Sequence, residues 1–142
     1  MIVEVWTDGS ATTAEKPGGW AYVILLDGAK VHEASGGMLY CTNNVAELTA
    51  ADEGLRYATS TYPDAEITLV SDSMLVLNYT NGTWRCKKFH LALLHSSLRK
   101  MYGHFNVDTR WVRGHTGVEH NERCDELAKA EREKLMNAEE AQ

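Results

Sequence analysis

Four acidic side chains, Asp8, Glu47, Asp72 and Asp125, have the types and settings best suited to chemistry in this chain. They are far apart in sequence, yet the local pattern around each would direct it toward one common point. Mg²⁺ is a hard ion that prefers carboxylate oxygens, and two such ions can hold the attacking and leaving oxygens of a phosphoryl group. The four acids therefore predict a two-metal phosphodiesterase site, provided that the fold brings them together.

Each acid also has an ordinary alternative role. Asp8 could belong to a turn, Glu47 could cap the start of its own helix, and Asp72 could be the N-cap of the next helix. Asp125 could form an ion pair with Lys129 four residues on. One shared site explains all four positions, whereas the alternatives require four independent explanations.

The spacing of apolar residues predicts the elements that must position these acids. In chain order they are strands at 2–8, 20–26 and 30–38, a helix from 44 to about 58, a strand at 66–71, helices from 73 to about 81 and from about 88 to 102, a strand at 107–112, and a helix from 121 to about 136.

This order predicts an α/β fold with one five-stranded mixed sheet, flanked by helices on both faces. Three antiparallel strands come first and two parallel strands are added to them. Since strand ends cluster the side chains that they carry, Asp8 and Asp72 would emerge side by side. The length fits one domain over residues 1–142, with 137–142 as a frayed tail.

Charge is distributed unevenly along the chain, whose net charge is −6. Residues 85–113 carry seven basic residues and one acid, while residues 1–84 sum to −8 and residues 114–142 to −4. A basic segment beside an acidic cluster suits a metal-dependent nuclease, in which cations hold the phosphate backbone. A solvated basic helix face is the alternative.

The cysteine content and the distribution of apolar residues also indicate the cellular compartment. The three cysteines are odd in number and show no C-x-x-C spacing. A secreted protein held by disulfides is therefore not expected, and we expect the protein to work in a reducing cytoplasm. No signal peptide precedes the first predicted strand, and no apolar run approaches the roughly 18 residues of a membrane helix. We expect no membrane role.

Two further groups of residues could serve a site. His115 lies between two glycines in a polar loop, where a histidine can move, and histidine is the side chain best suited to transferring protons at neutral pH. A plain loop histidine is the alternative. His115, His120 and Cys124 could also form a zinc site, but a convincing fourth ligand is missing.

Five segments of the chain, in order, resemble motifs of the bacterial type 1 ribonucleases H. They are residues 6–10, 42–48, 71–73, 111–115 and 121–128, which carry the four acids and His115. The resemblance covers nearly the whole chain. It implies the ribonuclease H fold and endonucleolytic cleavage of the RNA strand of RNA·DNA hybrids, leaving 5′-phosphate and 3′-hydroxyl ends, with roles in removing RNA primers and R-loops.

The resemblance also implies how the catalytic residues divide their work. Asp8 would bridge two Mg²⁺ ions, for which Mn²⁺ can substitute, and Asp72 would share the ion that activates the attacking water. Glu47 and Asp125 would hold the other ion, beside the leaving 3′-oxygen. His115 matches a mobile histidine that acts in proton transfer or product release.

Substrate contacts are implied in the same way. Asn43 and Asn44 match residues that read 2′-hydroxyls in the minor groove of the hybrid, assisted by the backbone amides near Gly9 and Ser10. An amide side chain suits this task because a 2′-hydroxyl both donates and accepts hydrogen bonds. Thr42 matches a residue that fixes a phosphate of the DNA strand.

The segment expected to contact the DNA strand of the hybrid is short. Trp84, Lys87 and Lys88 combine an aromatic side chain with cations, as grooves that follow a nucleic-acid backbone do. Only residues 81–88 separate the two flanking helices, so the basic handle of many relatives is predicted to be absent, as is an N-terminal hybrid-binding domain. Met74 stands where a glutamine often contacts the RNA. We expect weaker substrate affinity with a steeper salt dependence, not loss of chemistry.

Two other functions stay open. One is a ribonuclease H-like DNA nuclease or junction resolvase, which the pair Asn43-Asn44 disfavours. The other is a non-catalytic nucleic-acid-binding module, which the presence of all four carboxylates disfavours. A free-standing monomeric enzyme without an obligate protein partner is expected.

Overall fold

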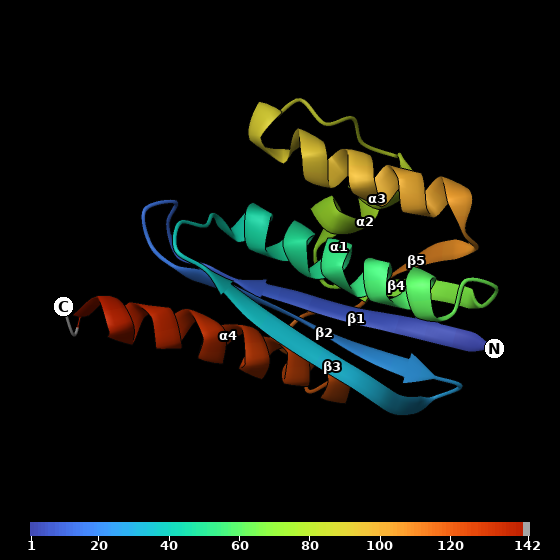
Figure 1. Ribbon diagram of the computed structural model, residues 1–142, viewed down its shortest axis with the longest axis horizontal. Coiled ribbons are helices and arrows are strands. Elements are labelled where there is room, and N and C mark those ends of the chain that lie inside the picture. The colour runs from blue at the N-terminus through green and yellow to red at the C-terminus, as the bar shows by residue number, and fades with distance from the viewer. Residues whose placement is uncertain (141–142) are drawn as a thin grey trace.

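A computed structural model describes residues 1–140 of the 142-residue chain. It is an α/β structure in which helices cover both faces of one five-stranded sheet (Figure 1). The elements are β1 (Ile2–Ser10), β2 (Gly18–Leu26), β3 (Ala29–Met38), α1 (Asn43–Thr61), β4 (Glu66–Ser71), α2 (Met74–Asn81), a 3₁₀ turn (Phe89–Leu91), α3 (Ala92–His104), β5 (Val107–Trp111) and α4 (Glu119–Glu140). No helix within residues 1–140 is both long and apolar enough to cross a membrane.

The strands lie in the order β3-β2-β1-β4-β5. β1, β2 and β3 are antiparallel neighbours, whereas β4 is parallel to β1 and β5 is parallel to β4. Trp6 pairs with Val70, so Asp8 and Asp72 each lie two residues beyond the last pair of β1 and β4. The predicted mixed sheet is confirmed, and its register places both acids at the same edge.

Two hydrophobic clusters hold the helices on the sheet. On one face, α1, α2 and α3 pack together over the strands, and alternate residues of β1 such as Val3 and Val5 are fully buried there. On the other face lies α4, whose Cys124 and Ala128 pack against Trp6. Both faces of β1 are covered by this arrangement, so the edge where β1 ends is the place where polar side chains meet.

Several element boundaries differ from the predicted ones, and three of the differences have a clear physical reason. β1 continues past Asp8 to Ser10, because residues 8–10 pair with residues 19–21 of β2. α1 begins at Asn43 and not at Asn44, since Thr42 is the N-cap and its Oγ1 accepts a hydrogen bond from the Val45 amide at 3.2 Å. The chain before α3 forms a 3₁₀ turn, so that helix begins at Ala92 instead of about residue 88.

The closing helix is longer than predicted. It begins at Glu119 and continues to Glu140, because neither glycine nor proline interrupts the backbone ladder in that segment. Residues 137–140 of the expected tail are therefore helical, and residues 141–142 lie outside the described part of the chain. Between α2 and α3 only the 3₁₀ turn intervenes, so the predicted lack of an additional basic helix is confirmed.

Close contact between α1 and the sheet depends on Gly54. A Cβ atom at this position would lie 2.6 Å from Val5 Cγ1 and 3.1 Å from Tyr22 Cβ, too close for an ordinary contact. The bare backbone therefore lets α1 lie directly on β1 and β2. This contact fixes the distance between α1 and the edge where β1 ends.

We predict that Gly54→Ala lowers the free energy of unfolding by about 1–3 kcal/mol, the usual cost of overpacking a core. Gly103→Ala is the matched control, because Gly103 also lies in a helix but a Cβ there would meet nothing within 4 Å. That control should raise the free energy of unfolding by about 0.4–1 kcal/mol. Urea denaturation measures both, and equal effects of the two substitutions would contradict the packing argument.

Candidate active site

The carboxylates of Asp8, Glu47 and Asp72 converge in the structure. Each offers an oxygen atom that lies within 4.8 Å of an oxygen of the other two. Asp8 comes from β1, Glu47 from the first turns of α1, and Asp72 from the end of β4. They line a depression of about 260 Å³ together with Gly9, Ser10, Ala11, Asn43, His115, Asp125 and Lys129.

Glu47 reaches this place because α1 starts directly against the end of β1. A Cβ atom at Gly9 would lie 2.5 Å from the carbonyl carbon of Ala46, so any other residue at position 9 would push the helix away. Glu47 is 7% exposed, and its Oε2 atom has no hydrogen-bond partner among the described residues. The alternative role of Glu47 as a helix cap is therefore wrong, since Thr42 caps α1.

Asp72 is not a helix cap either. The N-cap of α2 is Ser73, whose Oγ accepts a hydrogen bond from the Val76 amide at 3.3 Å. The main chain of Asp72 is fixed separately, because Trp111 Nε1 donates to its carbonyl oxygen at 3.2 Å. The carboxylate of Asp72 is thus left for the shared depression.

Asp125 joins the site from α4 on the other face of the sheet. It lines the same depression, and it lies close enough to Asp8 to raise the pKa of that residue. Its neighbour Cys124 is buried and donates a hydrogen bond to the carbonyl oxygen of Trp6 at 3.3 Å, which ties α4 to β1. The ion pair with Lys129 that was the alternative role of Asp125 is present as well, at 3.0 Å.

Burial and mutual repulsion shift the pKa values of these acids upward. Burial is the main cause for Asp8, followed by the charges of Asp72 and Asp125, and together they raise its pKa to about 8. Burial, followed by the charges of Asp8 and Asp72, raises the pKa of Glu47 to about 10. Burial also raises the pKa of Asp72, whereas the side chain of Asn121 acts in the opposite direction and lowers it. Within residues 1–140, none of the three converging acids forms an ion pair.

This donor set fits a hard divalent cation. All the converging ligand atoms are carboxylate oxygens, which Mg²⁺ and Mn²⁺ prefer, whereas a typical zinc site uses histidine and cysteine. A bound cation would also relieve the repulsion that raises the pKa values. The residues present therefore fit the metal that the sequence predicted.

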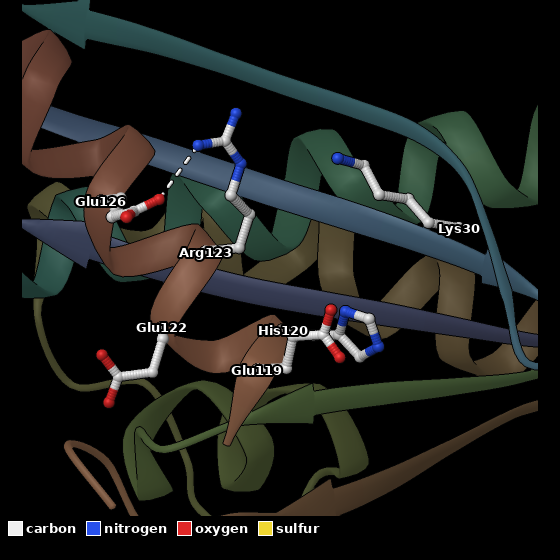
Figure 2. Close-up of a pocket in the computed structure, with 6 residues that line it drawn as sticks. All are labelled: Lys30, Glu119, His120, Glu122, Arg123 and Glu126. Carbon is white, nitrogen blue, oxygen red and sulfur yellow. Dashed lines mark hydrogen bonds and ion pairs between the residues drawn. The ribbon is translucent and has the colours of Figure 1, made fainter. Parts of the chain in front are cut away.

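The alternative zinc site is not formed within residues 1–140. His120 contacts the edge of Trp6 with ring centroids 5.4 Å apart, while buried Cys124 is bonded to the backbone. His120 also lines a second depression of about 380 Å³ beside the start of α4, whose other lining residues are Lys30, Glu119, Glu122, Arg123 and Glu126 (Figure 2). In Figure 2 the carboxylates of Glu119 and Glu122 point in different directions, so they do not form a ligand set.

The predicted substrate contacts divide into two groups. Asn43 lines the depression, with Gly9 and Ser10 on its rim, and exposed Asn44 follows at the start of α1. Thr42 lies next to them as the N-cap of α1. Trp84, Lys87 and Lys88 are all exposed in the segment between α2 and α3, and none of them lines the depression.

Sequence reasoning missed two residues near the site. Asn121, which is 3% exposed, lowers the pKa of Asp72. Arg132 Nη1 donates a hydrogen bond to Ser10 Oγ at 2.8 Å. Both lie on α4, at four residues before and seven residues after Asp125. This helical spacing was the available signal, since residues at these intervals share one face of a helix.

Comparison with known proteins gives the family. The RNase H family model matches residues 1–133. The chain belongs to the RNase H family. The predicted resemblance to bacterial ribonucleases H is therefore confirmed.

Relatives in the RNase H family match the chain along most of its length. Ribonuclease HI of Helicobacter pylori is 37% identical over 141 residues, which cover 94% of this chain and 95% of that protein. Ribonuclease H of Campylobacter concisus is 36% identical over 143 residues, with 96% of each chain covered. Among solved structures, RNase H1 of Halobacterium salinarum aligns with a TM-score of 0.79 at 26% identity, covering 92% of this chain and 97% of that one. LC11-RNase H1, solved in complex with an RNA/DNA hybrid, aligns with a TM-score of 0.81 at 24% identity, covering 94% of this chain and 99% of that one.

We predict that Asp8→Asn stabilises the metal-free protein at pH 8 by about 1–3 kcal/mol, and much less at pH 5. Because the pKa of Asp8 rises from 3.8 to about 8 on folding, the folded state holds more protons between these pH values, and stability falls as the pH rises through this range. Asparagine does not ionise and so removes this loss. Thermal unfolding of both proteins in EDTA between pH 5 and pH 8 measures this difference in stability.

Asp64→Asn serves as the control. It removes the same formal charge, but from a side chain that is exposed in the turn before β4. A stabilisation by Asp8→Asn that did not grow with pH would contradict the assigned pKa shift.

Proposed function

We propose that this chain is an endoribonuclease that hydrolyses the RNA strand of RNA·DNA hybrids and leaves 5′-phosphate and 3′-hydroxyl ends. The observation that carries the proposal is the convergence of three carboxylates, two of them buried, beside a fourth, within an RNase H family fold. Relatives named ribonuclease H or HI, and a structural neighbour solved with a hybrid, support the substrate class. RNA primers and R-loops in the cytoplasm are the expected cellular substrates.

Asp8, Glu47, Asp72 and Asp125 are the residues that would hold two Mg²⁺ ions, or Mn²⁺ in their place. When bound, these ions supply Lewis acids that provide a nucleophile from water at neutral pH and offset the charge on the leaving oxygen. Asp8 is the carboxylate whose pKa is raised by both Asp72 and Asp125. This central position supports its proposed role as the ligand shared by both ions.

His115 is proposed to move a proton during the reaction or during product release. It lines the depression, and its charge acts on Asp72 by lowering the pKa of that carboxyl, against the effect of burial. Its φ angle of 57° lies in the left-handed region, within a loop bounded by Gly114 and Gly117. Such an exposed loop lets the ring approach and leave the carboxylates.

The residues at the start of α1 are proposed to bind the hybrid. Asn43 and Asn44 expose amide groups that can donate to and accept from a 2′-hydroxyl, next to the backbone of Gly9 and Ser10. Thr42 Oγ1 accepts the capping hydrogen bond from α1, which leaves its O–H group free to donate to a phosphate. Recognition would therefore begin at the rim of the carboxylate cluster.

A second contact is proposed for the segment between α2 and α3. Trp84 is 45% exposed, and the exposed cations Lys87 and Lys88 follow it. A stacking surface with adjacent positive charge suits the DNA strand of the hybrid. We expect the enzyme to act as a monomer of one domain.

We predict metal-dependent cleavage of labelled RNA in an RNA·DNA hybrid, with a loss of at least about 10³-fold in kcat for Asp8→Asn, since a shared metal ligand is removed. Asp108→Asn, an exposed acid on β5, is the control and should retain activity. The same RNA single-stranded and in a double-stranded RNA should resist cleavage. Cleavage of a DNA duplex or DNA junction in preference to the hybrid would support the alternative DNA nuclease, and no cleavage of any substrate by folded protein with Mg²⁺ or Mn²⁺ would exclude catalysis.

We predict that His115→Ala lowers kcat about 10²-fold, within the range of one general acid or base, while KM changes less. Proton transfer is slowed, but the carboxylates that would hold the metal remain. His104→Ala, at the end of α3, is the control. Steady-state kinetics from pH 6 to 9 test the role, because His115→Ala should also change the shape of the pH profile. An unchanged kcat and profile would leave His115 as a plain loop residue.

A further inference from the structure

Arg132 is held at the edge of the candidate active site by two independent contacts. Its Nη1 atom donates to Ser10 Oγ at 2.8 Å, and Ser10 itself lines the depression that contains the carboxylates. Ser10 pairs with Gly19 across β1 and β2, and a Cβ atom at Gly19 would lie 2.9 Å from the Arg132 amide nitrogen. The backbone of α4 therefore rests on the sheet at this point, directly beside the end of β1.

The charge of Arg132 is not balanced as the other charges of α4 are. Arg123 forms ion pairs with Glu33 and Glu126, Lys129 with Asp125, and Lys134 with Glu131. Arg132 has no carboxylate within ion-pair distance among residues 1–140.

The donors of Arg132 are also incompletely used. Among the described residues its Nε atom, which is buried, has no hydrogen-bond partner, and only the hydroxyl of Ser10 accepts from its guanidinium. A guanidinium carries five N–H donors, and charge-assisted bonds to phosphate are among its strongest interactions. A side chain held in place with donors to spare is suited to an anionic ligand.

We infer that Arg132 is a further substrate-binding residue, whose guanidinium binds a backbone phosphate of the hybrid beside the metal-ligating carboxylates. The inference rests on the proposed function. It adds a contact on the face of the sheet that α4 covers, whereas Trp84, Lys87 and Lys88 come from the segment joining α2 and α3 on the opposite face (Figure 1). The hybrid would thus be held from both sides of the carboxylates.

Lys129 completes the path between the carboxylates and Arg132. It lies three residues before Arg132 on α4, so the two cations share a helix face, and it lines the depression with Ser10. Its charge is partly offset by Asp125, at 3.0 Å. A nucleic-acid strand that leaves the carboxylates over Ser10 therefore meets Lys129 and then Arg132, in a region whose net charge is otherwise negative.

The test is hybrid binding by Arg132→Gln and by Lys134→Gln, which remove the same charge from the same helix. Fluorescence anisotropy with a labelled RNA·DNA hybrid, at about 50–200 mM KCl without divalent metal, measures Kd and its salt dependence independently of cleavage. For Arg132→Gln we expect Kd to rise about 5–20-fold and the slope of log K against log salt to fall by about 1. Lys134→Gln should change Kd less than about 2-fold and leave the slope unaltered.

A merely structural role of Arg132 predicts a different result. Loss of the bond to Ser10 would lower the melting temperature and weaken binding, but it would not change the number of released counterions and hence the salt slope. An unchanged slope, or equal behaviour of the Arg132 and Lys134 variants, overturns the inference. Arg132→Lys should keep the slope while recovering only part of the affinity, because lysine lacks the planar fork of arginine.

The contacted phosphate can be located with uncharged linkages. Methylphosphonates placed one at a time along the RNA strand and then the DNA strand should reveal a position that weakens binding by wild-type protein but not by Arg132→Gln. If no position is coupled to Arg132, the inference is overturned. Cleavage of the unmodified hybrid by wild-type protein tests the proposed function separately, so the two can fail independently.

Discussion

Repulsion among buried carboxylates is the constraint on which the rest of this structure depends. Asp8, Glu47 and Asp72 lie within one small space, and burial with mutual charge raises their pKa values. Buried Asp52 shows the ordinary solution, since Arg56 lies 3.0 Å away and Ser97 donates to its other oxygen. Within the part of the chain that the structure describes, the cluster has no such partner, so the fold is less stable there than it could be and the donor set suits a divalent cation.

Backbone contact, not charge pairing, holds the cluster together. α1 approaches β1 at Gly9 and Gly54, where side chains would separate the two elements. α4 approaches β2 at Gly19 and is tied to β1 through Cys124. Since closely packed elements cannot shift apart without losing core contacts, the repulsion of the carboxylates is resisted by the hydrophobic clusters on both faces. The parallel pairing of β1 and β4 then fixes the separation of the two aspartates.

The sequence was sufficient for the elements and for the convergence of the acids, but not for their surroundings. β4 was predicted at its observed bounds, because a β-branched run followed by a polar end has one simple interpretation. The capping role of Glu47 was left open and proved wrong, since Thr42 and Asn44 are both good caps and only the observed hydrogen bond from the Val45 amide to Thr42 Oγ1 decides between them. Helical spacing from Asp125 could place Arg132 on the correct face of α4, but its contact with Ser10 depends on the register that places Ser10 opposite Gly19.

The placement of cations follows from the same repulsion. A lysine inside the cluster would neutralise the carboxylates and compete with a metal ion, and the structure confines such pairing to Lys129 at Asp125, outside the group of three. The remaining cations must then act from beside the cluster. A bound metal ion would strengthen the hold of a chain with a net charge of −6 on a polyanion, because it would offset the central acids that an approaching phosphate otherwise meets. Metal binding would displace protons from Asp8 and Glu47, whose pKa values are raised to about 8 and about 10, so metal, proton and substrate binding would be thermodynamically linked at one place.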